Sequence, residues 1–428
     1  FATDEQAHSI RASAMAQIAI AGFFIAYHLE ICIVPVVPRY DMRLSKNLRF
    51  SASLSRLHTS AKDKGCCLYR RRWYNSGKND RERQKAMAFN RIRKIPTAEE
   101  IKRELPMPAE LAKVKQRRDD ELRAVFSGAD SRFVLVIGPC SADSEEPVLE
   151  YLRRLAEVQR RVEDVLLLVP RIYTNKPRTT GEGYKGMVHQ PDPGKAADLS
   201  TGIKAIRRLH IKALAEFGLP AADEMLYPEN FAYLSDVLGY HAVGARSVEN
   251  QLHRLTASGV DVPVGMKNPT SGDLSVMLNS IYAAQLPHRF IYSGWEVETT
   301  GNPYAHAVLR GAVDATGRCL PNYHFEDLIG LAQAYTDMGL DNPAIVVDTN
   351  HANSQKRHEE QPRIAREVRH SRRYDSVLTR MVKGLMIESY LLPGRQDIGS
   401  NIPGCSITDP CLGWEDTERL IYDIAERV

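Results

Sequence analysis

Short apolar runs alternate with amphipathic stretches along residues 131–428. The first run, FVLVIGPC (133–140), precedes EEPVLEYLRRLAEVQRRV (145–162), whose apolar residues have helical spacing. Seven more apolar runs of strand length, each followed by a stretch that we interpret as helical, lie at 164–173, 219–225, 241–246, 262–268, 289–294, 344–350 and 382–391. Eight strand and helix units predict an α/β fold, a (β/α)8 TIM barrel, in preference to a doubly wound open sheet.

The first 86 residues differ from this pattern. Their apolar run Ile18–Tyr27 is too short to span a bilayer comfortably, and no clear signal-peptide cleavage site follows it. The remaining Ser- and Arg-rich sequence shows no periodic pattern of apolar residues. We therefore expect residues 1–86 to be a basic leader, either disordered or a non-native extension. Residues 87–130 carry capping signals and helical spacing, which predicts an N-terminal helical extension that opens at Met87 and precedes the barrel at 131–428.

Charge and cysteine content narrow the class of protein. Residues 1–86 contain 15 Lys and Arg against 7 Asp and Glu, whereas the rest contains 42 against 46. The mildly acidic bulk argues against a nucleic-acid platform, and nothing indicates a membrane protein. The seven cysteines have irregular spacing and no CxxC pair, so a reducing cytoplasm fits better than a disulfide framework.

Polar residues gather where the predicted strands end. In a TIM barrel the loops at the carboxyl ends of the strands build the active site. The residues at these positions are Cys140, Arg171, Lys176, Arg178, Glu224, Arg246, Lys267, Arg310, Asp348, His351 and Glu388. Each alone has an ordinary reading as a solvated cation, a buried cysteine or a helix cap. Their convergence on one rim favours a functional site.

These rim residues form two chemical groups. The six cations exceed what one phosphate needs, so the pocket suits two phosphorylated substrates, or one that also carries a carboxylate. Cys140, His351 and Glu388 combine sulfur, nitrogen and oxygen donors, which suits a divalent first-row metal such as Mn, Fe, Co or Zn. Lys267 has a rival reading, because a lysine inside a barrel can form a Schiff base.

Eight motifs then occur in an order and spacing that resemble class I 3-deoxy-D-arabino-heptulosonate 7-phosphate (DAHP) synthases. They are GPCS (138–141), KPRTT (176–180), GAR (244–246), PVGMKN (263–268), LRG (309–311), NHANS (350–354), ES (388–389) and SITDPCLGWEDT (406–417). The resemblance covers about residues 90–428. It implies condensation of phosphoenolpyruvate with erythrose 4-phosphate and water, giving DAHP and phosphate at the start of the shikimate pathway.

The resemblance also implies roles for individual residues. One divalent metal, with Mn favoured over Fe, Co or Zn, is expected at Cys140, His351, Glu388 and Asp409. Phosphoenolpyruvate is expected at Arg171, Lys176, Arg246, Lys267 and Arg310, and erythrose 4-phosphate at Lys176, Pro177, Arg178 and Thr179. Lys176, Lys267 and His351 are expected to take part in catalysis, and Asp348 to orient its neighbours. Relatives are usually dimers or tetramers. A Schiff-base aldolase using Lys267 and a non-catalytic metabolite-binding barrel remain the alternatives.

In feedback-regulated members of that family, a hairpin inserted after the sixth strand helps to form a pocket for an aromatic amino acid. The segment 290–310 is shorter here than in that subgroup, and Asp261 and Tyr292 stand where small serines line the pocket. We therefore predict weak or altered feedback inhibition.

Overall fold

A computed structural model describes residues 89–178 and 181–426 of the chain. The predictions for the basic leader, for Met87 and for Thr179 lie outside these residues. None of the helices in the described ranges is long and apolar enough to cross a membrane.

Eight parallel strands form the central sheet, in the order β2-β1-β12-β11-β8-β5-β4-β3. Their bounds are β1 Phe133–Gly138, β2 Leu166–Pro170, β3 Ala222–Glu224, β4 Tyr240–Val243, β5 Val264–Lys267, β8 Ala305–Leu309, β11 Ile345–Asp348 and β12 Val382–Glu388. A parallel bridge between Arg171 and Ala222 joins the two edge strands. The sheet is therefore closed into the predicted (β/α)8 barrel.

Alternate residues of each strand pack on opposite faces of this sheet. Val134 and Val136 point into an interior cluster with residues of the other strands, whereas Leu135 and Ile137 pack under the surrounding helices. Helix α4 (Ala109–Ser127) adds Phe126 and two neighbouring apolar residues to the interior cluster. The last turns of α4 thus close the end of the barrel opposite the carboxyl ends of the strands.

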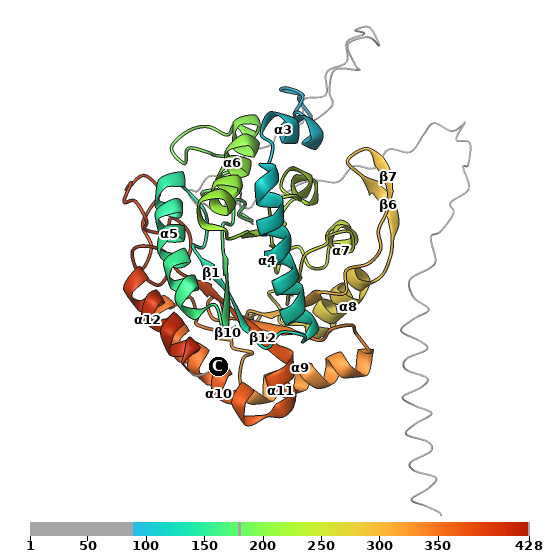
Figure 1. Ribbon diagram of the computed structural model, residues 1–428, viewed down its shortest axis with the longest axis vertical. Helices are drawn as coiled ribbons and strands as arrows, with labels where there is room; N and C mark the ends of the chain where they lie inside the picture. The colour runs from blue at the N-terminus through green and yellow to red at the C-terminus, as the bar shows by residue number, and fades with distance from the viewer. Residues whose placement is uncertain (1–88, 179–180, 427–428) are drawn as a thin grey trace, which may run out of the picture. The chain divides into compact units, whose positions relative to one another are not determined.

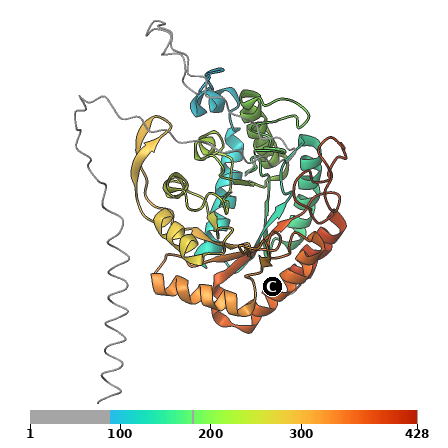
Figure 2. The ribbon, with the colours of Figure 1, turned by 180° about the vertical axis from the view of Figure 1, so that it is seen from behind.

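The helices lie outside the strands (Figures 1 and 2). They are α5 Glu145–Val162, α6 Leu199–Phe217, α7 Gln251–Ala257, α8 Leu274–Gln285, α9 Phe325–Met338, α10 Gln361–Tyr374, α11 Ser376–Met381 and α12 Trp414–Ala425. The N-terminal extension forms α3 (Ala98–Glu104) and α4, and the side chains of Thr97 and Glu100 form a reciprocal cap at the start of α3. Both helices precede β1 in the chain.

Residues 228–238 follow the third apolar run and are therefore expected to be helical, but they form only a short 3-10 helix, η1 (Pro228–Tyr233). A second 3-10 helix, η2, spans His358–Glu360. The buried Arg207 explains the first difference, because its Nη1 donates to the Tyr233 carbonyl oxygen at 2.8 Å and to Asp236 at 2.7 Å. The Tyr233 carbonyl oxygen therefore accepts from Arg207, whereas in a continuing helix it would accept from a backbone amide of the next turn.

The segment 289–294, predicted as the sixth barrel strand, is not part of the barrel. It contains β6 (Arg289–Tyr292), which pairs with β7 (Trp295–Glu298) in an exposed antiparallel hairpin, with Ile291 77% exposed. The sixth barrel strand is β8, whose five residues AHAVL are all buried. A second hairpin, β9 (Ala312–Val313) with β10 (Cys319–Leu320), follows β8, so antiparallel insertions flank the sixth strand on both sides.

Candidate active site

Three potential metal ligands meet at the carboxyl ends of β1 and β12. One ligand atom each of Cys140, Glu388 and Asp409 lies within 4.8 Å of the other two. Cys140 follows β1 by two residues and Glu388 ends β12, and Gly138 pairs with Glu388 in the parallel register of these strands. The strand register therefore sets the distance between the thiol and the first carboxylate, and the loop after β12 adds the second.

The charges of this cluster favour a bound cation. Burial, followed by the charge of Glu388, raises the pKa of the Cys140 thiol. Burial also raises the pKa of Asp409, but His351 and Lys356 outweigh it and lower that pKa to about 2. A divalent ion would compensate the two carboxylates and stabilise the thiolate, and sulfur with oxygen donors suits Mn, Fe, Co or Zn. The residues present thus fit the expected metal.

The fourth predicted ligand, His351, lies beside the cluster and faces Asp348. Its Nδ1 is 2.9 Å from Asp348 Oδ2, and its Nε2 is 3.8 Å from Glu388 Oε1. The same Asp348 oxygen accepts a hydrogen bond from Lys267 Nζ at 2.8 Å. Metal-binding histidines are commonly oriented by a carboxylate that contacts one ring nitrogen, so that the other ring nitrogen faces the metal. Asp348 and His351 have this arrangement relative to the ligand cluster.

Glu388 is fixed on its side chain and on its backbone. Arg171 Nη2 donates to Oε1 at 2.9 Å and Asn350 Nδ2 donates to Oε2 at 2.5 Å. The Gln361 side chain accepts from the Glu388 amide at 2.9 Å and donates to its carbonyl at 2.8 Å. Because four hydrogen bonds hold this residue, its carboxylate is preorganised before any ligand binds.

Buried cations with unused donors surround the cluster. Arg171 Nε and Nη1 and Arg310 Nη1 are buried and have no hydrogen-bond partner within the described residues. Burial lowers the pKa of Lys176, but the charges of Cys140 and Glu224 help to raise it overall, so Lys176 stays protonated. Buried donors are normally satisfied, so these unused guanidinium hydrogens indicate an anion that binds among them.

In the segment that follows β2, residues 175–178 contact residues 181–186 at the rim. Arg178 Nε donates to the Tyr184 carbonyl oxygen at 2.7 Å. Gly186 has a φ of +98°, and a Cβ there would lie 2.3 Å from the Thr174 carbonyl oxygen, so only glycine allows this close return. Lys185 is exposed, in keeping with a solvated side chain that carries no predicted role.

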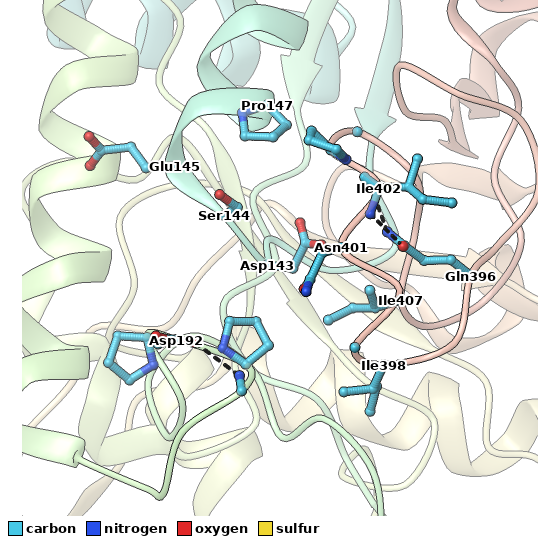
Figure 3. Close-up of a pocket in the computed structure, with 16 residues that line it drawn as sticks. Asp143, Ser144, Glu145, Pro147, Asp192, Gln396, Ile398, Asn401, Ile402 and Ile407 are labelled. Atoms are coloured by element: carbon cyan, nitrogen blue, oxygen red, sulfur yellow. Dashed lines mark hydrogen bonds between the residues drawn. The ribbon is translucent and has the colours of Figure 1, made fainter.

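A pocket of about 560 Å³ opens on the same rim, between the loops that follow β1, β2 and β12 (Figure 3). Asp143, three residues after Cys140, lines it and accepts a hydrogen bond from the Tyr390 hydroxyl at 3.1 Å. Among the described residues, no predicted site residue lines this pocket, although its walls belong to the loops that carry Cys140 and Asp409.

An Asp143→Asn variant is expected to be more stable than the wild type at about pH 8 and no more stable at about pH 4. Burial raises the pKa of Asp143 from 3.8 to about 6, so the folded state binds its proton more tightly than the unfolded state. The free energy of unfolding therefore falls as the pH rises from about 4 to about 6 and stays lower above it, by about 1 to 3 kcal/mol. Asparagine removes this loss.

Thermal unfolding of the wild type and of Asp143→Asn at both pH values measures the change in stability. Glu146→Gln, on the exposed first turn of α5, is the control and should show no pH-dependent gain. Equal stabilisation of Asp143→Asn at both pH values would contradict the assignment of the cost to the buried charge.

Comparison with known proteins decides the family. A family model described as the DAHP synthetase I family matches residues 107–421. The chain belongs to this family. It is 36% identical over 346 residues to the Trp-sensitive phospho-2-dehydro-3-deoxyheptonate aldolase of Enterobacter agglomerans, which covers 79% of this chain and 96% of the relative. It is also 36% identical over 345 residues to the Tyr-sensitive enzyme of Escherichia coli K12, with coverages of 77% and 92%.

A solved structure of a DAHP synthase supports the same fold. The phospho-2-dehydro-3-deoxyheptonate aldolase from Francisella tularensis SCHU S4 superposes with a TM-score of 0.73 at 30% identity. The match covers 78% of this chain and 97% of that structure. The resemblance stated from the sequence motifs is thereby confirmed, as is the barrel.

Within this DAHP synthase fold the structure brings most predicted site residues together. Arg246 is the outer member of the cation group, because its side chain is exposed although its charge still acts on the pKa of Arg310. Sequence reasoning missed Asn350 and Gln361, which hold Glu388. Asn350 could have been found from its place beside His351, whereas nothing near Gln361 in the sequence marks it as a partner of β12.

Proposed function

We infer the reaction from membership of the DAHP synthetase I family. The chain condenses phosphoenolpyruvate with erythrose 4-phosphate and water, giving DAHP and inorganic phosphate, the first step of the shikimate pathway. The observation that best supports an anionic substrate at the predicted site is the set of unused guanidinium donors on Arg171 and Arg310, buried beside the ligand cluster. Free energy spent on burying these cations is recovered when a polyanion binds.

We propose that one divalent metal, Mn before Fe, Co or Zn, binds at Cys140, His351, Glu388 and Asp409. When bound, it would supply Lewis-acid stabilisation to the aldehyde oxygen of erythrose 4-phosphate. The support is the donor set and its negative charge, together with the Asp348 contact that orients His351. Lys356 Nζ, 2.9 Å from Asp409 Oδ1, fixes that carboxylate from the solvent side.

The protein's own groups would hold the first substrate in place. Phosphoenolpyruvate is placed among Arg171, Lys176, Arg246, Lys267 and Arg310, with its carbon 3 facing the aldehyde. Carbon 3 attacks the aldehyde carbon, water adds to carbon 2, and the carbon-oxygen bond to the phosphate breaks. The two substrates repel each other at contact distance, so preorganised cations both neutralise them and fix the reactive geometry. Lys176, Lys267 and His351 are the proposed catalytic residues.

The second substrate is proposed to bind at Lys176, Pro177, Arg178 and Thr179. An Arg178→Ala variant should raise the KM for erythrose 4-phosphate by about tenfold to a hundredfold, the effect of losing a hydrogen bond to a charged group. The KM for phosphoenolpyruvate should stay close to that of the wild type. Steady-state kinetics with each substrate varied in turn gives the two KM values. Lys185→Met, which removes an exposed cation of the same segment, is the control. Equal changes in both constants would refute this division.

One assay tests the whole proposal. Both substrates are mixed with the protein and Mn²⁺, and phosphate release is measured together with the seven-carbon product. Stoichiometric phosphate and DAHP support the synthase. Binding of phosphoenolpyruvate without phosphate release would favour the alternative of a non-catalytic barrel.

The cellular location and the oligomeric state are also proposals. A cytoplasmic enzyme agrees with Cys140 remaining a free thiol, since an oxidised cysteine could not bind metal. A homodimer or homotetramer is proposed from the family resemblance.

Phenylalanine, tyrosine and tryptophan are expected not to inhibit this enzyme at micromolar concentrations. The hydroxyl of Tyr292 in β6 donates to the Pro228 carbonyl oxygen at 2.8 Å, so its ring covers the start of η1. A bulky, hydrogen-bonded side chain in place of a serine leaves less room beside the hairpin. Initial rates with each amino acid measure this, and ordinary micromolar inhibition would contradict it.

A further inference from the structure

A second large pocket lies at the end of the barrel remote from the catalytic rim. It has a volume of about 690 Å³ and is lined by residues from the end of α4, from α9 and α11, and from the start of β12. Figure 1 shows the course of these elements. Pockets of this size accommodate a small organic molecule. Residues at this end of a TIM barrel have no part in the barrel's reaction, because the active site occupies the opposite end.

The pocket is cationic. Arg380 and Lys383 line it, no Asp or Glu does, and neither cation makes a hydrogen bond or ion pair within the described part of the chain. Lys383 is partly buried, and burial, followed by the charge of Arg372, lowers its pKa. Arg372 lies close by, with its Nε on the Val382 carbonyl oxygen. The site therefore collects positive charge without a countercharge from its own walls.

The end of α4 offsets only part of this charge. Lys383 Nζ would lie 3.5 Å from a Cβ placed on Gly128, the residue that caps α4 in the left-handed conformation. A helix carboxyl end carries roughly half a negative charge, which partly balances one ammonium group. The guanidinium of Arg380 and the remainder of the Lys383 charge are left for a ligand.

The rest of the wall is apolar or neutral. Ile329 and Val377, both partly exposed, supply hydrophobic contacts, and Thr336 and Asn342 add neutral polar groups at the rim. Phosphoenolpyruvate and erythrose 4-phosphate have no apolar body that could use such a surface. The chemistry that matches is a compact anion joined to a hydrophobic ring or chain.

We propose that this pocket binds a small organic anion, a carboxylate, phosphate or sulfonate with an apolar body, held by Lys383 and Arg380. The anion pairs with the two cations, and its body packs on Ile329 and Val377. Lys383 is the second residue of β12, and Glu388 is the last. A ligand in the pocket therefore contacts the strand that carries a predicted metal ligand. The site is independent of the reaction assigned to the catalytic rim.

The test uses the full chain and 8-anilinonaphthalene-1-sulfonate, a sulfonate with a hydrophobic aromatic body, with Mn²⁺ and saturating phosphoenolpyruvate covering the catalytic rim. Fluorescence titration should give one saturable site. Lys383→Met and Arg380→Met should each weaken binding by about tenfold, and together by more. Lys113→Met on α4 and Arg160→Met on α5, both exposed cations, are matched controls and should bind the probe like the wild type.

A third variant tests the pocket without removing charge. Thr336→Trp places a large ring at the pocket rim on the exposed side of α9, so it should abolish binding while the unfolding temperature stays near the wild-type value. The proposal is overturned if the probe does not saturate, if the double cation variant binds as the wild type does, or if the control variants lose binding equally.

Discussion

A Cys140→Ser variant is expected to lose about a thousandfold in kcat and to bind Mn²⁺ far more weakly than the wild type. In the proposed metal site the Cys140 sulfur would be the soft member of a ligand set that otherwise supplies oxygen and nitrogen, and a hydroxyl of similar size would not replace it. Metal-ion stabilisation of a developing oxyanion contributes several kcal/mol, and each 1.36 kcal/mol is a factor of ten in rate. The loss follows from weaker metal binding rather than from misfolding, because serine fits the same buried space.

Two measurements test this expectation for Cys140. Titration of chelator-treated protein with Mn²⁺ gives the affinity without any substrate present, and phosphate release gives the rate. Cys319→Ser is the control, because this free cysteine lies in β10, outside the ligand cluster. Restoration by Mn²⁺ should succeed in the wild type and in the control. Wild-type Mn²⁺ affinity in Cys140→Ser would show that this sulfur is not a ligand.

Most of the barrel could be predicted because its strands are buried on both faces and read as unbroken apolar runs. The sixth strand escaped detection because its five residues, AHAVL, include two alanines and a histidine, a weak signal for a core strand. His306 is buried there through a hydrogen-bonding contact of 2.8 Å with Tyr240 and stacking on Phe126. The stronger local signal at 289–294 belongs to the exposed hairpin, where local β propensity does not report burial.

The site could be predicted as far as it follows strand ends. Cys140, Lys267 and Glu388 come at or just after a strand, so the fold class alone directs attention to them. Asp409 lies deep in the loop before α12, and only the family resemblance singled it out. Gln361 starts α10 and reaches the backbone of Glu388 across 27 positions, a contact that only tertiary packing creates.

Lys267 is expected to act through its charge, and a Lys267→Met variant should lose about a hundredfold to a thousandfold in kcat/KM for phosphoenolpyruvate. That is the usual effect of removing one preorganised donor from a buried site. Its Nζ is buried and donates to Asp348 at 2.8 Å, so methionine would leave that carboxylate with one contact fewer and the substrate with one cation fewer. Lys267→Arg keeps the charge and should recover part of the activity.

The same pair of variants separates the two chemical roles open to Lys267. A Schiff base needs a primary amine, so a covalent aldolase would be as inactive with arginine as with methionine. Borohydride added during turnover should leave the mass of the wild-type protein unchanged. The ion pair with Asp348 fits a charge role for Lys267. A substrate-sized mass increase on Lys267, together with an inactive arginine variant, would establish the Schiff-base reaction instead.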